Sequence, residues 1–191
     1  MGHMSTVTIR LLTFEEFERL PEQAEPGKRE LLDGEVIELP PADREHGNFS
    51  EQIFIWLREA VAAAHVRGEA AELGEVHIEM GYRLPGSAYV QPDVSITHAA
   101  QEYAKYLNGS PAIAIEVVSE SNTAEDMEKK VGLYFRYGAR EVWRVYRDPV
   151  HIVVHLPDYT SRTIRQGSLT TPLLSGFELL LADLQALIER S

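Results

Sequence analysis

Two acidic residues, Asp93 and Glu116, have the types and positions expected of ligands for a divalent cation. Asp93 follows a proline at the start of an alternating stretch, and Glu116 lies inside the apolar run 111–118. A carboxylate is rarely buried unless it is paired or binds a metal, so Glu116 needs a dedicated partner. Carboxylate oxygens suit magnesium-type ions, and a nearby cation stabilises negative charge that develops on a phosphate. The pair therefore suits divalent-metal and phosphate chemistry.

The same residues also have structural explanations, which the pattern alone leaves open. Asp93 could cap the turn after its proline, and Glu116 could form a buried ion pair with an arginine. Lys130 lies four residues after Asp126, which is the spacing of a surface salt pair on a helix. Glu30 could be an exposed strand charge.

The elements that must position these side chains are a strand and the helix that follows it. The run 111–118 is short, apolar and bounded by turn residues, which is typical of a strand buried on both faces. Asn122 and Glu125 have the spacing of a capping box at a helix start, and Gly138 fits the helix end. The apolar residues between them recur at helical spacing, at Met127, Val131, Tyr134 and Phe135.

The rest of the chain predicts further helices and strands in alternation. Asp33-Gly34 between two apolar stretches is a strong hairpin signal. The predicted elements are a short helix at 13–20, the hairpin at 29–39, a long helix at 48–66, strands at 76–84 and 89–96, a loop with a helical turn at 98–107, an antiparallel meander at 141–147, 152–156 and 159–164, and a terminal helix toward 184. This order predicts one mixed α/β (α+β) domain over residues 5–191, preceded by a cloning remnant at residues 1–4.

Composition narrows the class of protein. Lys and Arg total 18 against 30 for Asp and Glu, a formal net charge of −12, which argues against a non-specific coat for nucleic acid. A nuclease with a local carboxylate site remains compatible with this charge. The chain has no cysteine, which excludes disulfides and fits a reducing cytoplasm. No apolar run is long enough to span a bilayer, so no membrane association is expected.

An ordered set of motifs resembles the Uma-two family of restriction endonuclease-like proteins, a branch of the PD-(D/E)XK nuclease superfamily. The similarity covers roughly Phe14 to Asp183. The motifs are, in order, Arg29-Glu-Leu-Leu-Asp-Gly-Glu35, His46 before a long helix, Pro92-Asp93, Ile115-Glu-Val-Val-Ser-Glu-Ser121, Asp126 with Lys130 and Tyr134, and Gly138-Ala-Arg-Glu-Val-Trp143.

The resemblance implies a restriction-endonuclease-like mixed sheet flanked by helices and a metal-dependent site that cleaves phosphodiester bonds. Asp93 and Glu116 would bind Mg²⁺ or Mn²⁺, together with the backbone carbonyl of Val117. The superfamily lysine normally lies two residues after the glutamate, where this chain has Val118, and Lys130 on the next helix matches its place in this family. The resemblance also implies DNA as substrate and a homodimer.

Glu30 and His46 form a second tier of catalytic candidates, contributed by the hairpin and the long helix. Two other functions stay open: a catalytically inactive module that keeps the nuclease fold for binding or assembly, and a phosphodiesterase acting on RNA or a small nucleotide. A basic surface strip would favour a polynucleotide over a small substrate, and its candidate members are Lys28, Arg29, Arg44 and Lys105.

Overall fold

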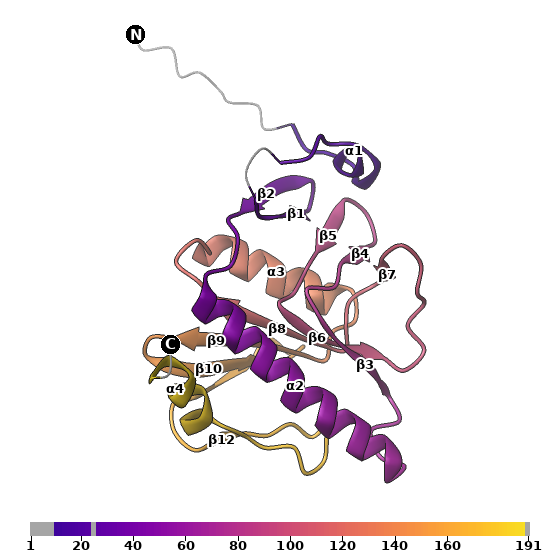
Figure 1. Cartoon of the computed structure of the whole chain (residues 1–191). Coiled ribbons are helices and arrows are strands. Elements are labelled where there is room, and N and C mark those ends of the chain that lie inside the picture. Colours follow the sequence, from indigo (N-terminus) through magenta and orange to yellow (C-terminus); the bar gives the residue numbers. More distant parts are fainter. Residues whose placement is uncertain (1–9, 24–25, 190–191) are drawn as a thin grey trace.

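A computed structural model describes residues 10–23 and 26–189 of the chain. Within these ranges the chain forms two larger β-sheets, a two-stranded sheet and helices packed around them (Figure 1). Residues 1–4, where a cloning remnant is expected, lie outside the described residues. Across the described part, no helix combines the length and apolar character needed to cross a bilayer.

A six-stranded mixed sheet forms the centre of the fold. Its order is β11 (Ser161–Ile164), β10 (Val150–His155), β9 (Glu141–Arg147), β8 (Ile113–Val118), β6 (Val94–His98) and β3 (Leu73–Ile78). β8 runs parallel to β9, whereas the other neighbours are antiparallel. The mixed sheet and the β9–β10–β11 meander confirm the predicted fold class.

Helices cover both faces of this sheet (Figure 1). Ile113, Ile115 and Val117 pack into one core with α2 (Arg44–Val66) and α4 (Leu181–Glu189). Ala114 belongs to a second core with α3 (Ala124–Arg136) and the five-stranded sheet. Strand β8 is therefore buried on both faces, as its continuous apolar pattern predicts.

The five-stranded sheet lies beside α3 and is built around the predicted hairpin. Its order is β2 (Glu35–Leu39), β1 (Lys28–Leu32), β5 (Ala88–Val90), β4 (Tyr82–Leu84) and β7 (Leu107–Asn108). Asp33 and Gly34 both have positive φ, of 49° and 91°. Two such residues form the hairpin turn that matches the twist of the flanking strands, so the hairpin prediction is confirmed.

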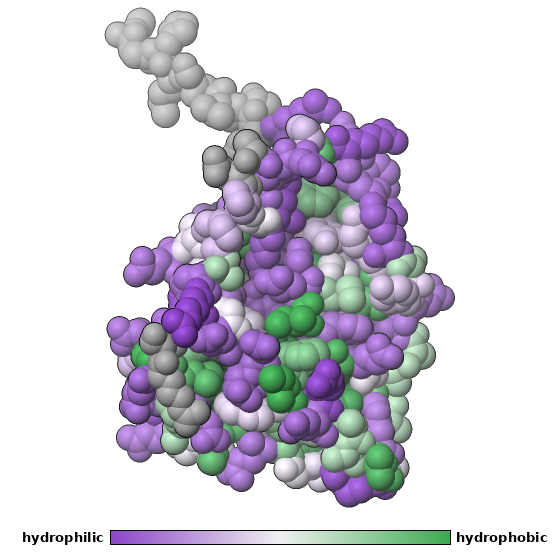
Figure 2. Space-filling model, viewed as in Figure 1, coloured by the Kyte–Doolittle hydropathy of each residue, from purple (hydrophilic) through white to green (hydrophobic). Residues whose placement is uncertain are grey.

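The remaining elements complete the two ends of the molecule. The short helix α1 (Phe14–Glu18) begins with a capping box, in which the side chains of Thr13 and Glu16 each accept from the backbone N–H of the other residue. Strands β12 (Ser168–Leu169) and β13 (Leu179–Leu180) form the small third sheet next to α4. On the face seen in Figure 2, hydrophilic residues dominate, and hydrophobic ones gather in the lower half around α2 and α4.

Two predicted strands are each divided, which corrects the predicted boundaries. The stretch 89–96 splits into β5 of the small sheet and β6 of the central sheet. Pro92 lies between them and has no N–H to give to a ladder, which suits a place where the chain leaves one sheet for another. The stretch 76–84 splits in the same way near Glu79, whose φ of 47° ends the extended conformation.

One helix start was misplaced, and the capping box expected at the start of another helix is made by different residues. Helix α2 begins at Arg44 rather than at 48, because Asp43 caps it by accepting from the backbone N–H of His46. Helix α3 is capped by Thr123, whose hydroxyl accepts from the N–H of Asp126. Asn122, the predicted cap, instead accepts from the N–H of Ser119 and closes the turn before the helix.

Candidate active site

Strands β6 and β8 bring the two predicted carboxylates together. Val94 pairs with Ile115 across this antiparallel ladder, so one residue further Asp93 lies beside Glu116. The Val117 N–H donates to Asp93 Oδ2 at 2.7 Å, which fixes the carboxylate against β8. Asp93 is 2% exposed and Glu116 4% exposed. Burial of both means that each charge needs a partner of opposite sign.

Lys130 of α3 is the partner of Glu116. Its ammonium lies 2.7 Å from Glu116 Oε1 and 3.0 Å from Glu30 Oε1. Lys130 is itself buried, so a surface salt pair with Asp126 is excluded. The alternative expected for Glu116, a buried ion pair, is present, but its cation is Lys130 and not an arginine.

Glu30 joins the same cluster from strand β1. Its side chain is fully buried, and Oε1 also accepts from the backbone N–H of Gln91 at 2.8 Å. Gln91 immediately precedes Pro92-Asp93, so this bond ties the position of Asp93 to the hairpin. The second oxygen, Glu30 Oε2, is buried and has no hydrogen-bond partner among the described residues. Glu30 is therefore not the exposed strand charge that its sequence context allowed.

Asp93 carries two further contacts, from Lys28 and His46. The Lys28 ammonium donates to Asp93 Oδ1 at 2.8 Å and to the Gln91 carbonyl at 3.0 Å. His46 Nε2 lies 3.2 Å from the same Oδ1. His46 lies in the first turn of α2, the long helix that was expected to contribute it to the site. Lys28 was not predicted, although it lies two residues before Glu30 on β1, and alternate residues of a strand share a face.

Tyr134 is a second residue that the sequence did not assign to the site. It is fully buried, as expected of a core residue, but its hydroxyl donates to Glu116 Oε1 at 2.6 Å. Tyr134 follows Lys130 by four residues, and residues with this spacing lie on the same face of a helix. This spacing is the feature of the sequence that could have placed Tyr134 beside Lys130 in the site.

The surrounding charges move the pKa values of the two carboxylates apart. Burial raises the pKa of Asp93, but the charge of Lys28 and the hydrogen bond from His46 outweigh it and hold the pKa below its usual range. Burial raises the pKa of Glu116 above its ordinary value, and the charge of Lys130 offsets only part of this. Two neighbouring carboxylates with opposite shifts are typical of sites that carry out chemistry.

The cations of the cluster are held in their charged forms. Burial lowers the pKa of Lys130, but the charges of Glu116 and Glu30 outweigh it, so the pKa lies above its ordinary value. Burial lowers the pKa of Lys28 too, but the charges of Asp93, Glu30 and Glu116 together outweigh it, so this pKa also lies above its ordinary value. Burial and the charge of Glu116 raise the pKa of Tyr134 well above its ordinary value, so its hydroxyl remains a donor.

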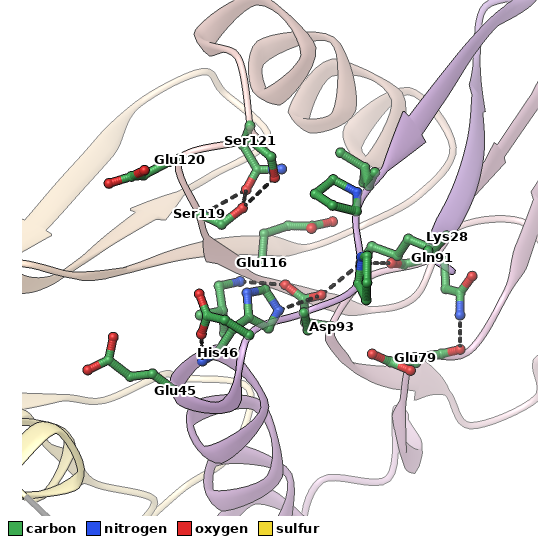
Figure 3. A pocket seen from close by; sticks show the side chains of 18 of the residues that line it. Lys28, Glu45, His46, Glu79, Gln91, Asp93, Glu116, Ser119, Glu120 and Ser121 are labelled. Carbon is green, nitrogen blue, oxygen red and sulfur yellow. Dashed lines mark hydrogen bonds and ion pairs between the residues drawn. The ribbon is translucent and has the colours of Figure 1, made fainter. Parts of the chain in front are cut away.

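The carboxylate pair opens into a cavity of about 820 Å³ (Figure 3). Asp93, Glu116, Val117 and His46 line it, together with the unpredicted Lys28. Lys130 and Glu30 lie behind this wall and are not among the described residues that line the cavity. The remaining wall comes from the segment 39–43 before α2, from the loop 119–122 after β8, and from Gly27, Arg29, Glu45, Glu79, Gln91 and Arg147.

The loop after β8 is held by its own hydrogen bonds. The hydroxyls of Ser119 and Ser121 lie 2.8 Å apart, and Ser119 also donates to Asn122 Oδ1 at 3.0 Å. These contacts give both serines a structural role in the turn. On the opposite wall, Arg147 binds Asp43 at 2.7 Å and Glu45 at 3.1 Å, which fixes the start of α2 to β9.

The donor set fits a hard divalent cation such as Mg²⁺ or Mn²⁺. The buried cluster holds three carboxylates, on Glu30, Asp93 and Glu116, and two ammonium groups, so it has a surplus negative charge when His46 is neutral. The orphaned Glu30 Oε2 is a further sign of this surplus. Among the described residues, no three His, Asp or Glu side chains are placed to hold an ion. Mg²⁺ is often bound by one or two carboxylates with water and substrate oxygens completing its shell, so two side chains suffice.

A continuous basic strip does not form from the expected residues. Three of the four are ion-paired with acidic residues: Lys28 with Asp93, Arg29 with Glu38 and Lys105 with Glu18. The cavity itself is lined by more acidic residues than basic ones. The acidic ones are Asp43, Glu45, Glu79, Asp93, Glu116 and Glu120, and the basic ones are Lys28, Arg29 and Arg147. Electrostatic attraction of a polyanion by these walls alone is therefore weak.

Tyr134→Phe is expected to destabilise the fold by about 1–3 kcal/mol, the usual range for a hydrogen bond to a charged group. The substitution removes only the hydroxyl that donates to Glu116 Oε1. Urea denaturation of the variant and of the wild type measures the difference. Tyr159→Phe is the matched control, because Tyr159 is 82% exposed and should tolerate the change. Equal stability of the two variants would show that the Tyr134 bond contributes nothing.

Comparisons with known proteins show the family of the chain and, separately, its fold. The model of the Uma2 family, described as "Putative restriction endonuclease", matches residues 14–184. Among solved structures, the chain is similar to "a putative nuclease belonging to DUF820" from Anabaena variabilis ATCC 29413, with a TM-score of 0.79 and 18% sequence identity. The similarity covers 93% of this chain and 99% of that one. At this identity it shows the fold. No curated protein matches the chain.

Proposed function

Because the chain belongs to the Uma2 family, whose description is that of a restriction endonuclease, we propose that it is a metal-dependent nuclease that hydrolyses phosphodiester bonds in DNA. The observation that carries this proposal is the pair Asp93 and Glu116. Two buried carboxylates lie side by side on adjacent strands and face a cavity of about 820 Å³. A purely structural ion pair would not need such an opening.

Asp93, Glu116 and the carbonyl of Val117 are the residues that would hold Mg²⁺ or Mn²⁺. When bound, the ion lowers the pKa of a water molecule and stabilises negative charge on the scissile phosphate. The chain's own contribution is to hold the two carboxylates rigidly. The Val117 N–H fixes Asp93 at 2.7 Å, and the hydroxyl of Tyr134 fixes Glu116 at 2.6 Å. Such supporting contacts orient metal ligands and tune their basicity.

Lys130 acts on this site through Glu116. Its ammonium lies between Glu116 and Glu30 and favours the ionised form of Glu116, which is the form that binds a cation. A direct contact between Lys130 and the reacting phosphate, as expected from the resemblance, would require the ammonium to leave Glu116. Glu30 positions both Lys130 and the Asp93 segment, the latter through the N–H of Gln91.

His46 is the titratable ring nearest to Asp93 on the side of the cavity. The ring nitrogens of a histidine at the wall of the site are suited to proton transfer. We assign it the task of moving a proton between the reacting water and solvent. The 3.2 Å contact with Asp93 Oδ1 holds the ring in place for this task.

DNA is the proposed substrate, with RNA or a small nucleotide as the second candidate. The acidic lining of the cavity favours the small nucleotide over either nucleic acid, because a small phosphodiester meets fewer repulsive walls than a long polyanion does. Bound cations would neutralise part of this repulsion, which makes nucleic-acid binding depend on the metal. We also propose a homodimer and a cytoplasmic location, as expected from the sequence. The division of the chain into a cloning remnant at residues 1–4 and one domain at residues 5–191 stays a prediction.

A catalytically inactive binding module is the competing proposal from another class. One observation favours it: Lys28 and Lys130 already neutralise Asp93 and Glu116 in the absence of any ion. A protein that keeps the fold but no longer cleaves would be stable in this arrangement. Metal-dependent hydrolysis separates the two proposals.

The test is a cleavage assay with Mg²⁺ or Mn²⁺ on supercoiled DNA, single-stranded RNA and bis(p-nitrophenyl) phosphate. We expect hydrolysis of DNA that EDTA abolishes and that Asp93→Asn lacks. Cleavage of RNA or of the small diester without DNA cleavage would replace the proposed substrate and keep the chemistry. Absence of hydrolysis from all three substrates, with either ion, would leave the binding module.

A further inference from the structure

Lys28 occupies a position in the site that its sequence context did not predict. Its ammonium lies 2.8 Å from Asp93 Oδ1 and 3.0 Å from the carbonyl of Gln91. It approaches from β1 of the five-stranded sheet, whereas Asp93 leads into β6 of the central sheet. Figure 3 shows Lys28, Asp93 and Gln91 meeting at one side of the cavity.

The two lysines of the cluster differ in their freedom to move. The Lys130 side chain is 3% exposed and binds two carboxylates, whereas that of Lys28 is 21% exposed and binds one. Lys28 also lines the cavity, and Lys130 is not among the described residues that do. A flexible lysine stem lets the ammonium of Lys28 turn toward the cavity while its backbone stays in the β1–β2 ladder.

Lys28 binds Asp93 Oδ1, the same carboxylate oxygen that a metal ion would bind. Asp93 Oδ2 accepts from the backbone N–H of Val117, so Oδ1 is the oxygen whose contacts are with side chains, those of Lys28 and His46. An ammonium and a divalent cation repel each other strongly at a few ångströms. Both cannot bind Oδ1 at full strength.

We propose that the Lys28 ammonium is a built-in competitor for the cation site, neutralising Asp93 until a divalent ion binds and then leaving Asp93 Oδ1. The released ammonium faces the cavity, where it is placed to contact a phosphate oxygen of the substrate. The inference rests on the proposed function, since it requires Asp93 to be a metal ligand. It explains how a buried carboxylate pair remains stable without an ion and still binds one.

Calorimetric titration of MnCl₂ into the full chain tests the proposal. Lys28→Met keeps the length of the side chain and removes its charge, so Mn²⁺ should bind about tenfold more tightly or better than in the wild type. The melting temperature of Lys28→Met should fall without the ion, and Mn²⁺ should raise it further than it raises that of the wild type. Lys28→Arg keeps the charge and should bind Mn²⁺ nearly as weakly as the wild type does.

Arg29→Met is the matched control, because Arg29 lines the same cavity but pairs with Glu38. Its Mn²⁺ affinity should stay within about twofold of the wild type, as screening weakens distant charges. Unchanged or weaker binding by Lys28→Met, or an equal gain in Arg29→Met, would overturn the proposal while leaving the metal site intact. No Mn²⁺ binding by any of the proteins would overturn both.

Folding of the variant supplies a second readout. If Lys28→Met unfolds without the ion, circular dichroism reports whether Mn²⁺ restores the native spectrum. Recovery supports the competition between ammonium and ion, because the ion then replaces the lost charge. No recovery with saturating Mn²⁺ contradicts it.

Discussion

Glu116→Gln is expected to reduce phosphodiester cleavage by about 10³-fold or more, which corresponds to about 4 kcal/mol of transition-state stabilisation. The amide has the shape of the carboxylate but no charge, so it binds a divalent cation poorly. Its carbonyl oxygen can still accept from Lys130 and from Tyr134, which both contact Glu116 Oε1. The fold should therefore persist while the metal-dependent activity is lost. Initial rates on the preferred substrate, with saturating Mn²⁺, measure the effect.

Glu120→Gln provides the control for this experiment. Glu120 is exposed and lines the same cavity, from the loop that follows β8. Losing its charge should leave the rate nearly unchanged. A Glu116→Gln protein that melts normally and cleaves as fast as the wild type would remove Glu116 from the catalytic site.

Lys130→Met should have the largest effect on stability, a loss of about 3–5 kcal/mol. The substitution fills the same space but removes the cation that lies between two buried carboxylates, Glu30 and Glu116. Urea denaturation at pH 7 measures the free energy of unfolding. The neighbouring Lys129→Met should cost less than about 1 kcal/mol, because Lys129 is partly exposed and its pairs with Glu35 and Glu125 are at the surface. Similar costs for the two variants would contradict the assigned role of Lys130.

The loss in Lys130→Met should also depend on pH in a defined direction. The pKa of Glu116 is already raised by burial in the wild type, and Lys130 holds it down. Without the ammonium this pKa rises further above its value in the unfolded chain. The folded state then binds more protons than the unfolded state between the two pKa values, so stability falls as pH rises through that window. Unfolding free energies of the variant that increase from pH 5 to pH 8 would contradict this account.

Periodicity and turn chemistry were enough to predict the hairpin, the buried strand β8 and the helix that follows it. They failed at Pro92, where one alternating stretch serves two sheets. Alternation records which residues are buried but not which sheet buries them, so the change of sheet left little trace beyond the proline itself. The misplaced start of α2 has a similar cause. Asp is a favourable residue type for a helix N-cap, but the polar residues that follow Asp43 have no apolar residues at helical spacing to indicate that the helix has begun.

Only part of the candidate site could be predicted, because sequence patterns again record local features and not contacts between distant segments. Asp93 stands out because it follows Pro92 at the start of a strand, and Glu116 because it lies inside an apolar strand. Lys130 was identified by the family resemblance, although its local pattern favoured a surface salt pair. Lys28 was missed because its partner Asp93 lies 65 residues away in another sheet. Tyr134 was assigned to the core, and its burial gives no indication that its hydroxyl contacts Glu116. Such long-range polar contacts depend on how the two sheets are placed, which the local pattern does not encode.

Calorimetric titration of Mn²⁺ into the wild type and into Asp93→Asn tests the central claim most directly. The structure places Asp93 Oδ1 on the cavity and Oδ2 against the Val117 N–H, so a neutral amide removes a metal ligand without opening the sheet. We predict saturable binding by the wild type, near-complete loss in Asp93→Asn, and wild-type affinity in the Glu120→Gln control. Equal binding by the wild type and Asp93→Asn would contradict the claim that Asp93 and Glu116 form the cation site of a nuclease.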